Sequence, residues 1–180
     1  YKRQTILMRM FYPDRREKSA YTIDYADLYR KGYRGVIFDI DNTLVPHGAP
    51  ATKEAAAFFA SLRETGFSTC LLSNNQKPRV APFADAVGSI YIENAHKPSV
   101  KNYQEACRRM GIKEEQAVFV GDQLFTDVYG AKRTGLYNIL TEPINPKEEI
   151  QIVLKRYLEH IVLFFYERDL ARGRITKKNS

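Results

Sequence analysis

Two carboxylates, Asp39 and Asp41, have the clearest chemical potential in this sequence, because they directly follow the apolar run Gly35–Phe38. Such a run is typical of a buried strand, and side chains two residues apart on a strand point to the same side. Like charges placed so close together repel each other, so the pair needs a cation or a proton to compensate it. A polar turn is the alternative interpretation, because the dipeptide Asp41-Asn42 is ordinary turn chemistry.

Polar side chains also follow three later apolar runs. Ser73 and Asn74 come after Phe67–Leu72, Lys97 comes after Ser89–Ile92, and Asp122 and Asp127 come after Ala117–Val120. Hydroxyl and ammonium donors suit the oxygens of a phosphoryl group. Carboxylates without a comparable number of local cations suit Mg²⁺, which prefers oxygen ligands and keeps several waters. Each group alone is explained as well by a turn or a surface loop, but their shared position favours phosphoryl chemistry with Mg²⁺ as cofactor.

The elements that would position these groups alternate along the chain from Gly35 to Leu140. The four apolar runs and a fifth, Leu136–Leu140, are the expected strands, and helices are expected at Thr52–Thr65, Val80–Val87, Ser99–Met110 and Thr126–Thr134. This order indicates parallel strands joined by crossovers, with helices on both faces of the sheet. We therefore predict an α/β three-layer sandwich with a five-stranded parallel central sheet. Ligands of such sheets bind beyond the carboxyl ends of the strands, which is where the polar groups fall.

We expect one domain, since 180 residues are enough to bury a full core. Its core is expected at 35–140, with an N-terminal extension at 1–34 and a C-terminal extension at 141–180. A short helix is expected around Asp24–Lys31 in the first extension.

The C-terminal extension contains a segment, Ile150–Arg168, that is expected to be helical and becomes strongly apolar from Ile161 to Tyr166. Three roles are open for it. It contacts a membrane surface, packs as a helix or strand on the sheet, or forms a dimer interface. In the first role Lys155, Arg156 and Arg168 lie near anionic headgroups, where each contributes about 1 kcal/mol of attraction.

The net charge of +7 favours an anionic partner, such as a phosphorylated substrate, an anionic membrane or a nucleic acid, although a basic surface also serves solubility alone. No stretch approaches the ~18 apolar residues that span a bilayer. The first residues lack the apolar core of a signal peptide. Cys70 and Cys107 are expected to be buried thiols, which suggests a reducing compartment. We expect a cytoplasmic location, with peripheral contact at the inner membrane face left open.

The ordered motifs resemble those of phosphatases of the haloacid dehalogenase (HAD) superfamily, subfamily IIIA. That family has Asp-x-Asp-x-Thr after the first strand, Ser or Thr after the second, and a Lys upstream of an acidic motif after the fourth. This sequence supplies Asp39, Asp41, Thr43, Ser73, Lys97, Gly121, Asp122 and Asp127. The runs at 38–45, 72–75 and 121–128 further resemble the YqeG-like branch of bacterial HAD proteins. That branch is similar to the mitochondrial phosphatases that dephosphorylate phosphatidylglycerophosphate.

The resemblance implies a HAD-like fold and a role for each acidic residue. Asp39 attacks phosphorus and forms an aspartyl-phosphate, because a carboxylate is nucleophilic without prior deprotonation. Asp41 protonates the leaving oxygen and then deprotonates the hydrolytic water. It has to carry a proton part of the time, which neighbouring carboxylates favour. Mg²⁺ is held by Asp39, the main-chain carbonyl of Asp41 and Asp122, with Asp127 close behind.

The remaining motif residues are expected to serve the phosphoryl group or the rest of the substrate. Ser73 and Lys97 stabilise charge on the transferring group, and Lys97 also holds Asp39. Asn74 and Thr43 are counted with the phosphate-binding residues, although Thr43 is expected mainly to orient Asp41. Substrate contact is expected for Asn75, Lys77, Arg79, His47 and His96, although a loop imidazole is more often simply solvated.

The spacing between the motifs leaves no room for an inserted cap domain. Only 31 residues separate Asp41 from Ser73 and only 23 separate Ser73 from Lys97, and each interval holds one helix and one strand. An open site suits a large substrate, and we favour phosphatidylglycerophosphate or a related anionic lipid. A phosphatase of nucleic-acid ends or phosphoproteins and a non-catalytic assembly protein are the alternatives. No specific nucleic-acid partner is expected, and a homo-oligomer is left open.

Overall fold

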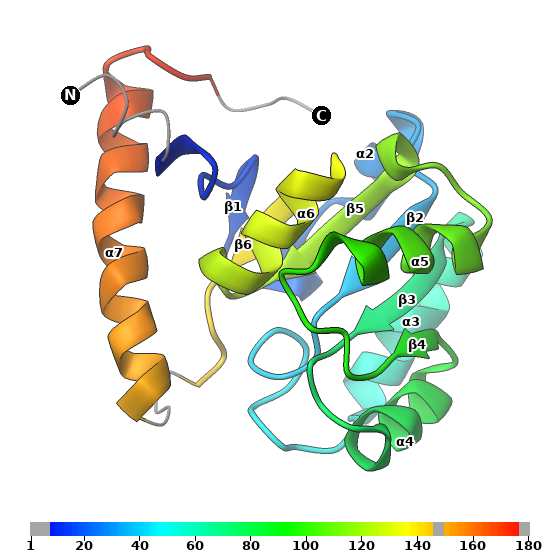
Figure 1. Ribbon diagram of the computed structural model, residues 1–180. Coiled ribbons are helices and arrows are strands. Elements are labelled where there is room, and N and C mark those ends of the chain that lie inside the picture. The colour runs from blue at the N-terminus through cyan, green and yellow to red at the C-terminus, as the bar shows by residue number, and fades with distance from the viewer. Residues whose placement is uncertain (1–7, 146–149, 177–180) are drawn as a thin grey trace.

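A six-stranded parallel sheet forms the centre of the structure (Figure 1). The computed structural model describes residues 8–145 and 150–176. The strand order is β1-β6-β5-β2-β3-β4, and each neighbouring pair runs parallel. The strands are β1 (Arg15–Glu17), β2 (Gly35–Phe38), β3 (Ser68–Leu72), β4 (Ile90–Ile92), β5 (Ala117–Gly121) and β6 (Tyr137–Thr141).

Helices cover both faces of the sheet, and a long C-terminal helix stands beside one edge (Figure 1). Those of the described residues are η1 (Ala20–Thr22), α2 (Tyr25–Arg30), α3 (Lys53–Thr65), α4 (Lys77–Val87), α5 (Val100–Met110), η2 (Glu114–Gln116), η3 (Leu124–Val128), α6 (Tyr129–Thr134) and α7 (Ile150–Ala171). Helices α2, α3 and α4 share one apolar core with the sheet, and α5 and α6 share the other. The three-layer α/β sandwich predicted from the sequence is confirmed.

Alternation along β2 divides its side chains between the two cores. Val36 and Phe38 join the core of α3 and α4, whereas Ile37 joins the core of α5. This period of two is what a strand buried on both faces requires. Cys70 and Cys107 are free and buried in the second core, as predicted.

Local signals in the sequence account for the ends of α3. The Thr52 hydroxyl accepts a hydrogen bond from the N–H of Ala55 and caps the N-terminus. Gly66 follows the last turn with a φ of 107°, a left-handed conformation that glycine adopts at little cost. Within 35–141, which the structure describes throughout, the connections between strands hold these short helices and no inserted cap domain.

The helix predicted at Thr126–Thr134 begins earlier than expected. A π-helical turn, η3, precedes α6, and the carbonyl of Gln123 accepts hydrogen bonds from the N–H groups of both Asp127 and Val128. A widened turn of this kind inserts one extra residue, so the regular apolar spacing does not reveal it. Such turns are frequent at functional sites.

The predicted five-stranded sheet is wrong by one strand, because β1 adds to the β6 edge. Its three residues, Arg-Arg-Glu, carry no apolar pattern, so only backbone pairing with β6 identifies them as a strand. The preceding residue, Asp14, is fixed by β6. Its N–H donates to Asn138 Oδ1 at 3.1 Å, and its carboxylate accepts from Asn138 Nδ2 at 2.7 Å.

Helix α7 is present as predicted, and its inner face packs beside the end of the sheet formed by β1 and β6. Val162 and Tyr166 are buried against Tyr12, Leu124 and Leu140. The packing role left open for this segment is therefore confirmed for one face of the helix. Among the described residues, no helix combines the length and the apolar content needed to cross a membrane.

Replacing Asn138 with Ala should lower the free energy of unfolding by about 1–3 kcal/mol, because the buried carboxylate and N–H of Asp14 lose partners in a site closed to water. Urea unfolding measures the loss. Gln104→Ala, which removes an exposed amide on α5, is the control. Equal stability of the Asn138 variant and the wild type would contradict the role assigned to this contact.

Candidate active site

Asp39 directly follows β2, and the turn after it is built around a left-handed residue. Asn42 has a φ of 63°, which asparagine tolerates better than most residues. Its N–H donates to the carbonyl of Val45 at 2.7 Å and closes the loop that carries Asp41 and Thr43. The alternative interpretation, that Asp41-Asn42 belongs to a turn, is therefore confirmed. This turn sets the direction of the Asp41 side chain.

Lys97 is the cation that lies between two of the carboxylates. Its ammonium contacts Asp39 Oδ1 at 2.6 Å and Asp127 Oδ1 at 2.7 Å, and all three residues are buried. Burial alone would lower the pKa of Lys97, but the Asp127 and Asp39 carboxylates outweigh this effect and raise that pKa above the ordinary lysine value. Lys97 therefore stays charged, and the prediction that it holds Asp39 is confirmed.

Asp122 takes its partners from two distant segments. The Thr43 hydroxyl donates to Asp122 Oδ1 at 3.1 Å, so Thr43 orients Asp122 instead of Asp41, the partner expected from the sequence. The guanidinium of Arg156, on α7, pairs with Asp122 Oδ2 and also donates to the Asp122 carbonyl oxygen at 2.6 Å. Both carboxylate oxygens of Asp122 are thus fixed by donors.

Asp39, Asp122 and Asp127 form a group that fits a metal ion. Each offers one carboxylate oxygen, and these oxygens lie within 4.8 Å of one another in a buried position. Oxygen ligands so arranged suit Mg²⁺. Gly121 permits the crowding, since a Cβ there would lie 2.4 Å from Asp127 Oδ2. The carboxylate of Asp41 lies outside the group, and the part predicted for its carbonyl stays a prediction.

Two carboxyl groups of this site, those of Asp39 and Asp122, have pKa values above the ordinary value for aspartate. Burial raises the pKa of Asp39; Lys97 opposes this effect, and the Asp127 and Asp122 carboxylates add to it. Burial also raises the pKa of Asp122; Asp127 adds to the rise and Arg156 opposes it. A bound cation would favour the ionised forms, because carboxylate ligands bind metal only when deprotonated.

Asp41 points to a different set of donors. Its Oδ1 accepts from the Gly48 N–H at 2.7 Å and from Arg79 Nη2 at 2.8 Å, and its Oδ2 accepts from Asn75 Nδ2 at 2.7 Å. Each carboxylate of the Asp39–Asp41 pair therefore has its own cationic partner, which removes the expected repulsion. Asn75 and Arg79 hold Asp41, and their contact with substrate stays a prediction.

The loop after β3 holds the backbone of Lys97 through the side chain of Asn74. Asn74 Oδ1 accepts the N–H of Lys97 at 2.7 Å, and Asn74 Nδ2 donates to the Lys97 carbonyl at 3.4 Å. Ser73 is buried, and its Oγ accepts the N–H of Asn75 at 3.1 Å. Asn74 thus positions Lys97, while phosphate binding by Ser73 or Asn74 stays a prediction. Three further residues expected to contact substrate are exposed: His47, Lys77 and His96.

Helix α7 supplies two site residues that the sequence did not reveal. Glu159 Oε1 accepts the N–H of Leu124 at 2.8 Å, and Glu159 Oε2 accepts from Arg156 Nη1 at 2.9 Å. The guanidinium of Arg156 is turned inward to Asp122, which contradicts the headgroup contact expected for it. The spacing of three residues between Arg156 and Glu159 is a local signal for an ion pair, but it does not say what the pair binds.

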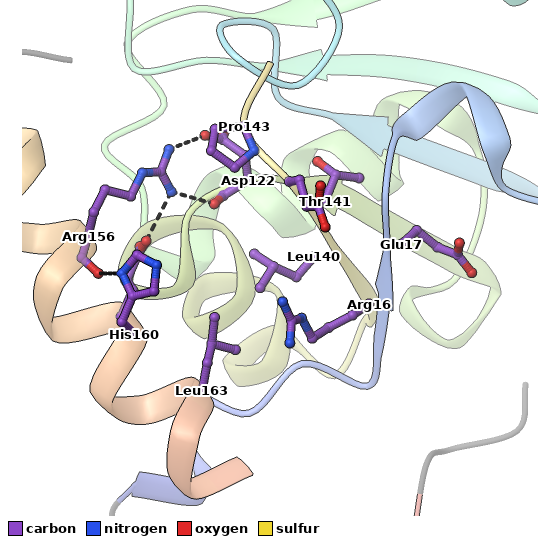
Figure 2. Close-up of a pocket in the computed structure, with 11 residues that line it drawn as sticks. Arg16, Glu17, Asp122, Leu140, Thr141, Pro143, Arg156, His160 and Leu163 are labelled. Carbon is purple, nitrogen blue, oxygen red and sulfur yellow. Dashed lines mark hydrogen bonds and ion pairs between the residues drawn. The ribbon is translucent and has the colours of Figure 1, made fainter. Parts of the chain in front are cut away.

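A pocket of about 470 Å³ lies between α7 and the carboxyl ends of β1 and β6 (Figure 2). Leu140, Pro143 and Leu163 form its apolar wall. Its polar lining residues are Arg16, Glu17, Asp122, Thr141, Glu142, Arg156, Glu159 and His160. The pocket reaches Asp122, so it adjoins the acidic group and leaves space beside it.

Comparison with known proteins agrees with this geometry. A family model described as a haloacid dehalogenase-like hydrolase matches residues 48–135. The probable phosphatase YqeG of Bacillus subtilis is 34% identical over 164 residues, which cover 91% of this chain and 95% of that protein. The chain belongs to the YqeG-like phosphatases of the haloacid dehalogenase family. The resemblance predicted from the motifs is confirmed, and the protein is a phosphatase.

Two further comparisons bear on the branch and the fold. Phosphatidylglycerophosphate phosphatase 1 (chloroplastic/mitochondrial) of Arabidopsis thaliana is 29% identical over 161 residues, which cover 84% of this chain and 46% of that protein. The crystal structure of an uncharacterized protein from Listeria monocytogenes serotype 4b superposes with a TM-score of 0.51 and 18% identity, covering 65% of this chain and 86% of that chain. The structural match shows the fold alone.

Mg²⁺ should raise the melting temperature of this phosphatase more at about pH 8 than at about pH 5. Without metal, the raised pKa values of Asp39 and Asp122 mean that the folded state binds more protons than the unfolded state. Their contribution to stability therefore falls as the pH rises above about 4, the ordinary carboxyl value. The ion binds the deprotonated groups, so its stabilisation grows over the same range.

Thermal unfolding in EDTA and in Mg²⁺ at both pH values measures this difference. Asp85→Asn, which removes an exposed carboxylate on α4, is the control and should keep the wild-type response. Asp122→Asn should lose most of it. An equal rise at the two pH values would contradict the assignment of these carboxylates to the metal.

Arg156→Ala should lower the free energy of unfolding by on the order of 3 kcal/mol in EDTA, because it leaves the buried Asp122 carboxylate without its cation. Chemical denaturation measures the change. Arg172→Ala, at an exposed position just beyond α7, should stay within about 0.5 kcal/mol of the wild type. Equal stability of the two variants would show that the α7 contact contributes nothing.

Proposed function

We propose that this phosphatase hydrolyses a phosphomonoester through a phosphorylated Asp39, with Mg²⁺ as cofactor and phosphatidylglycerophosphate or a related anionic lipid as substrate. The observation that carries the proposal is the buried contact between Lys97 Nζ and Asp39 Oδ1 at 2.6 Å. This contact holds the Asp39 carboxylate at the carboxyl ends of the strands. The positive charge of Lys97 favours the ionised form of that carboxylate.

The reaction proceeds in two displacements. A carboxylate oxygen of Asp39 forms a bond to phosphorus while the bond from phosphorus to the leaving oxygen breaks. Asp41 gives its proton to that oxygen, and then takes a proton from the water that cleaves the acyl phosphate. When Asp41 carries the proton, one of its oxygens becomes an O–H donor, and the carboxyl group keeps its remaining acceptor capacity for Gly48, Asn75 and Arg79.

Charge on the transferring group is met by fixed donors. The Ser73 hydroxyl accepts one hydrogen bond, which leaves its O–H free to donate to a phosphoryl oxygen. Lys97 adds a buried positive charge. Asp39, Asp122 and Asp127 would hold Mg²⁺, and the ion supplies charge that offsets the repulsion between the nucleophilic carboxylate and the phosphoryl group.

A lipid substrate is supported by four features. The connections between β2 and β6 contain no cap, so the site does not close over a small metabolite. The net charge of +7 favours an anionic substrate. A relative that matches most of this chain is named for phosphatidylglycerophosphate. The pocket between α7 and the sheet edge provides space for groups beyond the phosphoryl group.

Asp39→Asn should abolish phosphate release from phosphatidylglycerophosphate in detergent micelles, because the amide is a poor nucleophile. Phosphate assays with Mg²⁺, run beside a panel of soluble phosphomonoesters, measure this. Asp85→Asn is the matched control and should keep full activity. Turnover of Asp39→Asn at the wild-type rate would overturn the nucleophile assignment, and wild-type activity confined to soluble esters would overturn the lipid assignment.

A further inference from the structure

The outer face of α7 carries a cluster of exposed apolar side chains. Among the described residues, seven large apolar side chains are exposed, and four of these lie on this one helix. They are Tyr157 (67% exposed), Leu158 (48%), Ile161 (40%) and Phe164 (66%), which we call the α7 stripe. Their spacing of three and four residues places them on one side of a helix.

Basic residues continue the stripe toward the C-terminus. Arg168 lies four residues beyond Phe164 on the same side of the helix, and its guanidinium stacks on the Phe165 ring at 4.5 Å. Arg172 follows the helix and is exposed. None of the acidic side chains of this part of α7 belongs to the stripe. Glu159 is buried, and Asp169 is buried and pairs with Arg168 at 3.7 Å. Glu167 is exposed and pairs with Arg16 at 2.7 Å. An apolar stripe with a positive end and no acidic member complements an anionic, partly apolar surface.

The inner face of the same helix contacts the acidic group of the site. Figure 2 shows Arg156, His160 and Leu163 on the side of α7 that faces the pocket, with Arg156 reaching Asp122. The stripe lies on the face of α7 that points away from the acidic group, at the same turns of the helix as Arg156. A surface bound by the stripe would therefore lie one helix diameter, ~10–12 Å, from the side of α7 that contacts Asp122.

We infer that the α7 stripe docks this phosphatase on the surface of an anionic phospholipid bilayer. The helix lies in the interface with Tyr157, Leu158, Ile161 and Phe164 among the headgroups and upper acyl chains, while Arg168 and Arg172 meet anionic headgroups. The inference rests on the proposed lipid substrate, because docking here would bring the catalytic edge to a phosphate presented by the bilayer. A second copy of this chain is the competing occupant.

Co-sedimentation of the full chain with vesicles tests the docking. The wild type should pellet with phosphatidylcholine vesicles that contain phosphatidylglycerol at low salt, and much less with phosphatidylcholine alone. Replacing both Tyr157 and Phe164 with Ser should weaken binding by about tenfold or more, because two large apolar contacts are lost. Ile90→Ser removes a side chain that is 40% exposed on β4, at the opposite sheet edge, and should bind as the wild type does.

Hydrolysis of a soluble phosphomonoester, unchanged in both variants, shows that each is folded. Docking is overturned if the wild type stays in the supernatant at low salt, or if the Tyr157/Phe164 variant binds as well as the wild type. It is also overturned if light scattering shows a dimer that the same variant converts to a monomer. Hydrolysis of phosphatidylglycerophosphate in micelles without vesicle binding would overturn docking alone, whereas vesicle binding without such hydrolysis would overturn only the lipid substrate.

Discussion

The contact of Lys97 with Asp39 and Asp127 is the interaction on which the site depends. Burying a charge costs several kcal/mol unless it is paired, and this sheet edge buries three carboxylates together. Lys97 compensates two of them, and Arg156 compensates the third, Asp122. Three carboxylates face two cations, so one net negative charge is left in the group, which is the charge that a divalent cation would meet.

Much of this site could be predicted from the sequence, because parallel strands bring their carboxyl ends to one edge. Asp39, Ser73, Lys97 and Asp122 each follow a strand, so their order along the chain already places them together. The partner of Thr43 could not be predicted, because Asp122 lies 79 residues away along the chain and only the packing of the two loops brings it to the hydroxyl.

The remaining differences arise from contacts that no local pattern encodes. Strand β1 is three charged residues long, so its pairing with β6 depends on the rest of the sheet being present. The inward direction of the Arg156 side chain depends on its contact with Asp122, which lies 34 residues away along the chain. In the sequence alone, a basic residue beside apolar residues on a helix is as compatible with contact to a membrane surface as with a contact inside the protein. Only tertiary packing determines which way its side chain points.

A crystal structure of the protein with Mg²⁺ and beryllofluoride, a mimic of a carboxylate-bound phosphoryl group, tests the central claim most directly. The account predicts beryllium bonded to an oxygen of Asp39, a fluorine in contact with Lys97 Nζ, and Mg²⁺ held by the carboxylates of Asp39 and Asp122. Beryllofluoride bonded to another residue, or a metal held without Asp39, would contradict it.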